Sequence, residues 1–178
     1  MTLATCSCGQ TQFELAGTPI ASAACHCASC RAAAARFVQL GAPSVLDADG
    51  GVPLTLVRKD RVRCVSGHEH LRAYRLTETT KTRRVLARCC NSPMFIDPGA
   101  HWLSFFHDRL GSHAPPIEMR LSRVSTAPPS DGVPSSTTIS PRLVWRIFRA
   151  WAAMGFRTPK LEPIEEAQFS AHARETTA

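Results

Sequence analysis

Three cysteines fall within six residues of this 178-residue chain, at Cys25, Cys27 and Cys30, and Arg31 follows directly. On extended chain, residues two apart point to the same face, so Cys25 and Cys27 lie together. Cys30 then completes a CxxC turn. Three clustered thiolates form a partial cage for a soft, tetrahedral ion such as zinc, with one position left over. The spacing therefore predicts a zinc site open to a ligand, and an open position distinguishes a reactive metal site from a structural one.

Two other interpretations of this motif stay open. Cys64 or a histidine would turn the site into a closed structural one, and a redox CxxC would need only Cys27 and Cys30. Cys64, however, lies in the apolar run 62–65, where an inert buried thiol is the simpler expectation. The redox interpretation lacks a surrounding βαβ pattern. The histidines at positions 68, 70, 101, 107 and 113 have no ligand spacing, so we expect them to be solvated.

A second pair of cysteines, Cys6 and Cys8, repeats the same spacing near the N-terminus, with Gly9 allowing a tight turn behind them. The two thiols are expected to grip one ion together. Eight cysteines in all could instead form disulfides, but the N-terminus shows neither the basic nor the apolar region of a signal peptide. Metal binding and a cytoplasmic location are the expectation.

Short apolar runs separated by turn residues predict a mainly β fold. We expect two strands within residues 1–16, further strands at 54–57 and 62–65, and an antiparallel pair at 71–76 and 83–88. Residues 31–35 favour a short helix, whose N-terminal dipole and Arg31 would both help to hold thiolates ionised. Residues 37–40 are predicted to resume extended chain. The run 101–106 fits a strand or a short helix equally well.

The C-terminal third differs in composition. Residues 125–141 are rich in Pro, Ser and Thr, which predicts a linker. Ser140 and Pro141 then resemble the N-cap and first turn of an amphipathic helix ending near Gly155. Its apolar stripe is expected to pack back onto the domain, although a membrane-surface or partner helix is the alternative. The predicted division is a β domain at 1–124, a linker at 125–141, and a helix with a polar tail at 142–178.

The net charge of +7 raises the question of a nucleic-acid partner. Residues 58–90 hold ten Lys and Arg against three Asp and Glu, but they alternate with apolar residues and include one aromatic, Tyr74. Without a stacking platform, nucleic-acid binding is not favoured. No run of eighteen apolar residues is present, so a transmembrane segment is not expected either. The sequence does not reveal the oligomeric state.

The pattern CSCGQTQFEL, then CHCASCR, then a Cys-rich turn before Ser-Pro-Met-Phe resembles the glutathione-dependent formaldehyde-activating enzyme family, also called the centromere-protein-V-like family. The resemblance covers roughly residues 3–100. It implies the Mss4-like fold, in which small antiparallel sheets are braced by two zinc ions, one structural and one reactive. Cys6 and Cys8 match the first half of the structural four-cysteine site. Cys25, Cys27 and Cys30 match the reactive site.

The third motif departs from the family, which usually has Cys-X-X-Cys-Gly there. Alignment on Ser-Pro places Ala87 at the first cysteine and Cys90 at the second, with Asn91 in place of Gly and Cys89 as an extra thiol. This CCN variant suggests a branch that differs from the founding enzyme. Adjacent residues on a regular strand face opposite ways, so both thiols reach one ion only through a sharp turn, which Asn91 tolerates. We favour Cys89 and Cys90 both as ligands. The rival is Cys90 with water or another donor.

The resemblance implies a carbon–sulfur lyase-type activity on glutathione, or a similar thiol, and formaldehyde or a similar small aldehyde. Cys25, Cys27 and Cys30 would carry that reaction on zinc, with Arg31 beside the bound ligand. The alternative is a zinc-binding interaction module without catalysis. The altered third motif, the linker and the amphipathic tail all leave room for this second hypothesis.

Overall fold

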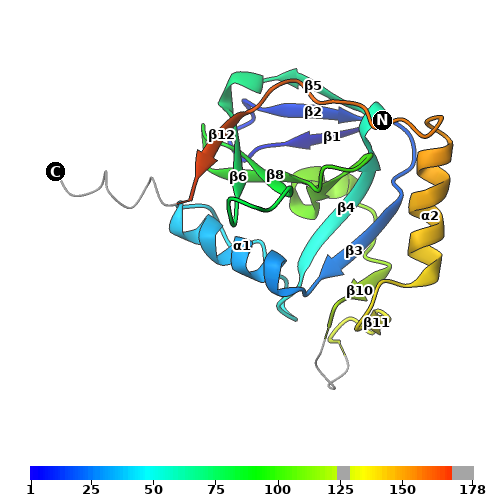
Figure 1. Ribbon diagram of the computed structural model, residues 1–178. Coiled ribbons are helices and arrows are strands. Elements are labelled where there is room, and N and C mark those ends of the chain that lie inside the picture. The colour runs from blue at the N-terminus through cyan, green and yellow to red at the C-terminus, as the bar shows by residue number, and fades with distance from the viewer. Residues whose placement is uncertain (124–128, 170–178) are drawn as a thin grey trace.

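The computed structural model describes residues 1–123 and 129–169, and within them the chain forms two β-sheets with few helices (Figure 1). The smaller sheet is antiparallel, and its three strands follow the order β1 (Thr2–Thr5), β2 (Gln12–Leu15) and β5 (Val62–Ser66). The strands at its centre and edge are short, as the punctuated sequence indicated. The prediction of a mainly β fold built from small antiparallel sheets is confirmed, and it is consistent with the Mss4-like fold.

The larger sheet has nine strands within the described residues, with antiparallel pairing in its middle and parallel pairing at both edges. In spatial order these are β11 (Ser135–Ser136), β10 (Met119–Leu121), β3 (Ala21–Cys25), β4 (Val52–Arg58), β9 (Trp102–Phe106), β8 (Ser92–Asp97), β7 (Arg83–Ala87), β6 (Leu71–Arg75) and β12 (Glu165–Gln168). Short 3-10 helices, η1 (Lys59–Arg61), η2 (His68–His70) and η3 (His107–His113), connect some of them. The run 101–106 is therefore a strand, β9.

Both faces of the larger sheet are covered, which explains why its strands are apolar almost throughout. Adjacent residues in β9 show the division, because Phe105 and Phe106 belong to different core clusters. On one face, Phe13 of the smaller sheet packs edge-on against Phe95 and Phe105, with ring centroids 5.4 and 5.6 Å away. The two sheets thus share one core, while the opposite face packs against helices.

Helix α1 (Ala28–Gln39) covers that opposite face, and it is longer than predicted. Residues 37–40 were expected to be extended, and this expectation is wrong. Phe37 lies one turn beyond Ala33 and Ala34 on the same helical face, and all three are buried. Its ring packs edge-on against Phe106 at 5.6 Å. Burying a side chain of this size contributes about 2 kcal/mol, which is enough to extend the helix by another turn.

Helix α2 (Pro141–Ala152) begins where the sequence predicts. The hydroxyl of Ser140 accepts a hydrogen bond from the Leu143 amide, and Pro141 occupies the first turn. The preceding described residues 129–136 run beside the sheet, where β11 pairs with β10. The three-part domain division remains a prediction, and residues 124–128 of the predicted linker and 170–178 of the tail lie outside the described residues. No helix in the described part is long and apolar enough to span a membrane.

Candidate metal centres

Four of the cysteines come together where the turn between β1 and β2 meets the turn between β7 and β8. The sulfur atoms of Cys6, Cys8, Cys89 and Cys90 all lie within 4.8 Å of one another. Four of the pairs are 3.4 to 3.8 Å apart. A tetrahedral zinc ion with Zn–S bonds of 2.3 Å requires sulfur separations of about 3.8 Å. The four thiols therefore fit a closed metal site.

Both Cys89 and Cys90 belong to this group, although they are neighbours in sequence. The chain turns sharply after β7, and the Cys90 amide donates to the Ala87 carbonyl at 3.3 Å. Asn91 has a φ of 51°, the left-handed conformation expected for the residue that replaces glycine. Its side-chain amide donates to the Leu40 carbonyl at 2.7 Å, at the C-terminal end of α1. Asn91 thus shapes the turn and ties it to the helix.

Hydrogen-bond donors favour the ionised forms of two of these four thiols, Cys6 and Cys90. Burial raises the pKa of Cys6, but a hydrogen bond of 3.2 Å from the Thr11 amide helps to lower it overall. Burial likewise raises the pKa of Cys90, yet the Ser92 hydroxyl 3.1 Å away helps to bring it down to about 6. Burial raises the pKa of Cys89 to about 12. The group is prepared for a partial negative charge, and a cation would complete the ionisation.

The other three thiols lie at the junction of β3 and α1. Cys25 ends the strand, Cys27 is the N-cap of the helix, and Cys30 lies in its first turn. Their sulfur atoms lie within 4.8 Å of one another, with Cys25 and Cys27 3.4 Å apart. Within residues 1–123 and 129–169, no further Cys, His, Asp or Glu joins this group. The donors fit three corners of a zinc tetrahedron, and the fourth corner has no ligand from the described chain.

Hydrogen bonding concentrates negative charge on Cys27. The pKa of Cys27 is lowered because the Cys25 thiol and then the Cys30 thiol donate to its sulfur. The Cys30 backbone amide, 3.4 Å away, adds a donor from the helix N-terminus. Donation of the Cys25 thiol to Cys27 raises the pKa of Cys25. Hydrogen bonds with Cys25 and Cys27, together with burial, raise the pKa of Cys30. Cys27 is therefore the preferred thiolate of the group.

A buried arginine lies behind these thiols. The Arg84 side chain in β7 is 2% exposed, and its Nη2 donates to the Ser29 hydroxyl at 2.6 Å. In the described residues its Nε and Nη1 have no hydrogen-bond partner, and it makes no ion pair with a carboxylate. Burial lowers its pKa, while negative charge on Cys30 and Cys27 opposes that shift. A buried cation needs an anionic partner, so Arg84 favours thiolates at these two positions.

Arg84 was missing from the residues proposed from the sequence. Arg83 and Arg84 are adjacent on a strand, so one of them had to face the interior, and that signal was visible. Arg83 instead forms an ion pair of 2.7 Å with Asp97. The arginine proposed from the sequence, Arg31, is exposed on the first turn of α1, and no hydrogen bond or ion pair to it is found within the described residues.

A second group of polar side chains braces the same stretch through His26. Arg120 in β10 is 4% exposed and donates through Nη1 to His26 Nε2 at 3.2 Å. It also pairs with Asp47, Asp49 and Asp131 at 2.7 to 2.9 Å. Because an arginine only donates, His26 Nε2 accepts and its proton lies on Nδ1. Burial lowers the pKa of His26, which keeps the ring neutral. His26 is thus a support for its neighbours.

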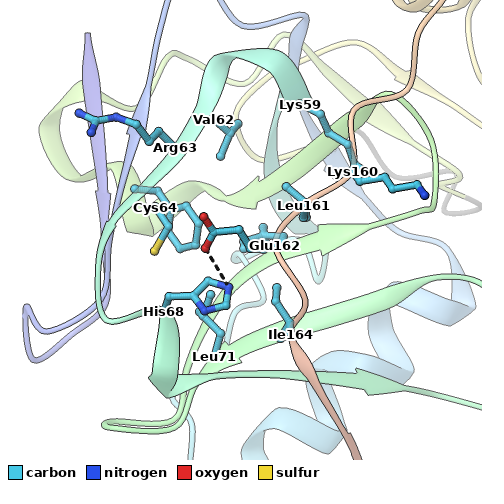
Figure 2. Close-up of a pocket in the computed structure, with 12 residues that line it drawn as sticks. Lys59, Val62, Arg63, Cys64, His68, Leu71, Lys160, Leu161, Glu162 and Ile164 are labelled. Atoms are coloured by element: carbon cyan, nitrogen blue, oxygen red, sulfur yellow. Dashed lines mark ion pairs between the residues drawn. The ribbon is translucent and has the colours of Figure 1, made fainter.

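Cys64 belongs to neither group. It lines a cavity of about 220 Å³ together with His68, Leu71 and Glu162 (Figure 2), and none of the seven clustered cysteines lines it. His68 Nε2 lies 3.5 Å from the Glu162 carboxylate. Burial raises the pKa of Cys64, whose thiol donates to the Ser66 carbonyl at 3.4 Å. Cys64 is therefore a protonated thiol, remote from the fourth corner of the three-cysteine group.

Comparison with known proteins gives a family match for the part of the chain that contains all seven clustered cysteines. The family model described as "Glutathione-dependent formaldehyde-activating enzyme" matches residues 1–107. A search of curated proteins finds no match. Among solved structures, the fold is similar to a crystal structure of a Rhodobacter sphaeroides protein, at 20% identity and a TM-score of 0.45, covering 75% of this chain and 99% of that one. A likeness of that degree carries no argument about activity.

Proposed function

Because the chain belongs to the glutathione-dependent formaldehyde-activating enzyme family, we propose that it is a zinc-dependent enzyme of the carbon–sulfur lyase type. Its substrates would be glutathione, or a similar thiol, and formaldehyde or a similar small aldehyde. The reaction joins the thiol sulfur to the carbonyl carbon and moves the thiol proton to the oxygen, or runs in reverse. No oxidant or reductant is needed, so two substrates and one centre suffice.

The observation that carries this proposal is the incomplete three-cysteine group at the N-terminus of α1. Cys25, Cys27 and Cys30 would hold one zinc ion, and Cys6, Cys8, Cys89 and Cys90 a second, structural one. At the three-cysteine centre, zinc would supply a Lewis acid that favours the thiolate form of a bound thiol and polarises an aldehyde oxygen. The closed four-cysteine centre has no corner for a substrate.

The chain's own residues would adjust the charge of the reactive centre. Three thiolates and one zinc ion carry a net charge of −1, which weakens attraction for a further anionic ligand. The buried guanidinium of Arg84 offsets that charge from behind, where solvent does not screen it. Arg31 is exposed on the first turn of α1, so we propose it as the contact for a carboxylate of the thiol substrate.

A second candidate function is a zinc-braced interaction module without catalysis. The observation that favours it is the exposed aromatic face of α2, which the formaldehyde chemistry does not use. The two candidates differ in what the three-cysteine centre does when substrates are supplied, so activity at that centre distinguishes them.

The test measures S-hydroxymethylglutathione formation by nuclear magnetic resonance with ¹³C-labelled formaldehyde. The wild-type protein should exceed the spontaneous rate, and Cys27→Ser should fall to it. Cys64 belongs to neither cysteine group, so Cys64→Ser should retain the wild-type rate. A wild-type rate equal to the spontaneous one would favour the interaction module.

Metal analysis provides an independent check of the two-centre arrangement. We expect close to two zinc ions per chain for the wild type and for Cys64→Ser, and about one for Cys27→Ser. One zinc ion or none in the wild-type protein would contradict the two-centre proposal.

A further inference from the structure

Helix α2 presents its largest apolar side chains to solvent. Its inner face consists of Leu143 and Ala150, which are buried, with Ile147 partly buried beside them. Trp145 and Phe148 are 58% and 45% exposed. The predicted apolar stripe therefore packs onto the domain along one edge only, and that expectation is corrected. The structure leaves exposed an outer face made of Ile139, Val144, Trp145, Phe148, Trp151 and Phe156.

The aromatic rings of this outer face form a continuous chain of contacts. Trp145 stacks on Phe148 with centroids 5.6 Å apart, and Phe148 lies 6.1 Å from Phe156. Trp151 meets Phe156 edge-on at 5.2 Å. Scattered apolar side chains are normal on a surface, but a connected group of this kind marks an interaction site.

The helix is fixed with this face outward. His101, which is 8% exposed, has its Nε2 3.0 Å from the Ile147 carbonyl oxygen, and its ring stacks on Trp151 at 5.6 Å. The expectation that His101 is solvated is therefore wrong, because it packs under α2. Arg146 pairs with Glu118, the residue that directly precedes β10. Folding of the domain thus holds the aromatic face in place without burying it.

Basic residues flank the aromatic face on one side. At 100° per residue, Arg142 and Arg149 follow Trp145 around the helix, before the buried face begins. Arg149 also lines a hollow of about 380 Å³ with Arg58 and Arg146. Residues 142–160 contain no Asp or Glu, so nothing on this segment neutralises the positive charge. The chemistry of this face calls for an apolar layer next to a row of anions.

We propose that α2, with Ile139 and Phe156, is a docking surface for an anionic lipid bilayer. The aromatic side chains would enter the boundary between headgroups and acyl chains. The arginines would contact lipid phosphates from the flank. This proposal does not depend on the chemistry at the cysteines.

The alternative occupants fit the charge and shape less well. A second copy of the chain, docked through the same face, would place Arg142 and Arg149 near their own counterparts, and residues 142–160 contribute no acid to offset them. An acidic protein would need a groove that matches a protruding helix with large aromatic side chains. A bilayer interface adapts to any such shape and supplies both the apolar and the anionic layer.

The test is co-sedimentation of the full chain with vesicles of phosphatidylcholine containing 30% phosphatidylglycerol, compared with pure phosphatidylcholine. We expect at least tenfold stronger partitioning onto the anionic vesicles, weakened by salt, with a blue shift of tryptophan fluorescence. The double variant Trp145→Ser/Phe148→Ser should partition onto the anionic vesicles at least tenfold more weakly than the wild type. The double variant Arg142→Gln/Arg149→Gln should lose the preference for anionic lipid.

Val38→Ser is the matched control, because Val38 is equally exposed but lies on α1. It should bind vesicles as the wild type does. Since all the changed residues are exposed, thermal unfolding should confirm that each variant is folded. Three results would overturn the proposal: no binding to anionic vesicles, equal binding by the aromatic double variant, or light scattering that shows a dimer lost in that variant.

Discussion

The two cysteine groups use the same side chain in different constructions. Cys6 and Cys8 meet Cys89 and Cys90 across two turns that lie 83 residues apart in the chain. Cys25, Cys27 and Cys30 all come from one strand-to-helix junction. The first arrangement closes four corners and joins distant segments, whereas the second leaves a corner and places its thiols at a helix N-terminus. Distance in sequence therefore separates a group suited to stability from one suited to reactivity.

The largest expected effect is on stability, and it should distinguish the groups. Cys89→Ser removes a donor from the group that joins β1 and β2 to β7 and β8, so a metal ion held there would link the two sheets less firmly. We expect a loss of about 4 kcal/mol in the free energy of unfolding. For a chain of this size, that corresponds to a fall in Tm of roughly 8–16 °C, measured by circular dichroism.

Cys30→Ser supplies the matched comparison, because it removes one thiol from the local group. Its Tm should fall by less than half as much, since no distant segments are joined there. Equal falls for the two variants would remove the distinction between a structural and a reactive group.

A chelator should remove metal from the three-cysteine group before it removes metal from the four-cysteine group. With cobalt in place of zinc, three-thiolate coordination leaves a corner that glutathione can occupy, so its addition should change the visible absorption spectrum. A chelator should also remove about one equivalent of metal well before the second. The same titration with Cys27→Ser, which retains the four-cysteine group, should show no glutathione response. A glutathione response in that variant would show that the open coordination position does not belong to the three-cysteine group.

A smaller effect is expected from the positive charge behind the reactive thiols. Arg84→Met removes the cation that favours thiolates at Cys27 and Cys30, so the protonated form gains and the pKa of Cys27 rises. In metal-free protein, the pH profile of alkylation by iodoacetamide should therefore move to higher pH. Arg83 pairs with Asp97, so Arg83→Met is the control and should leave the pH profile unchanged.

A further effect on stability tests the connection between the two groups. Asn91→Ala loses the hydrogen bond to Leu40 and keeps an unfavourable φ of 51°, at a cost of about 2 kcal/mol in unfolding free energy. Asn91→Gly also loses the bond but relieves the backbone, so its cost should be near zero. Denaturant unfolding measures both. If the alanine variant were as stable as the glycine variant, the left-handed turn would have no energetic role.

Spacing alone was enough to predict the group Cys25, Cys27 and Cys30 and the pair Cys6 and Cys8. The doubled Cys-X-Cys pattern is local, and side chains two apart on extended chain share a face whatever the rest of the fold does. The meeting of Cys6 and Cys8 with the third cysteine motif was expected from the family resemblance, because no local rule connects positions 83 residues apart. The start of α2 was equally predictable, since a Ser-Pro cap satisfies the helix terminus by local contacts.

The sequence was less informative where packing decides. Phe37 extends α1 because Phe106 of a distant strand provides a surface for it. Arg84 lies behind the three thiols because its neighbour Arg83 takes the other face of the strand, where it pairs with the buried Asp97 of β8. That choice depends on the position of β8. The orientation of α2 was missed for the same reason. An apolar stripe predicts that a helix face will be covered, but it does not say by what.

The sequence separation of the two groups also has a consequence for biosynthesis. During translation at about 5–20 residues per second, Cys30 is made roughly 3–12 seconds before Cys89. The entropic cost of closing a chain segment rises with its length, so the six-residue group forms readily in an incomplete chain. If the three-cysteine group binds zinc as proposed, its metal uptake would precede the joining of the two sheets. The last cysteine pair to emerge, Cys89 and Cys90, would then complete the fold around a centre already assembled.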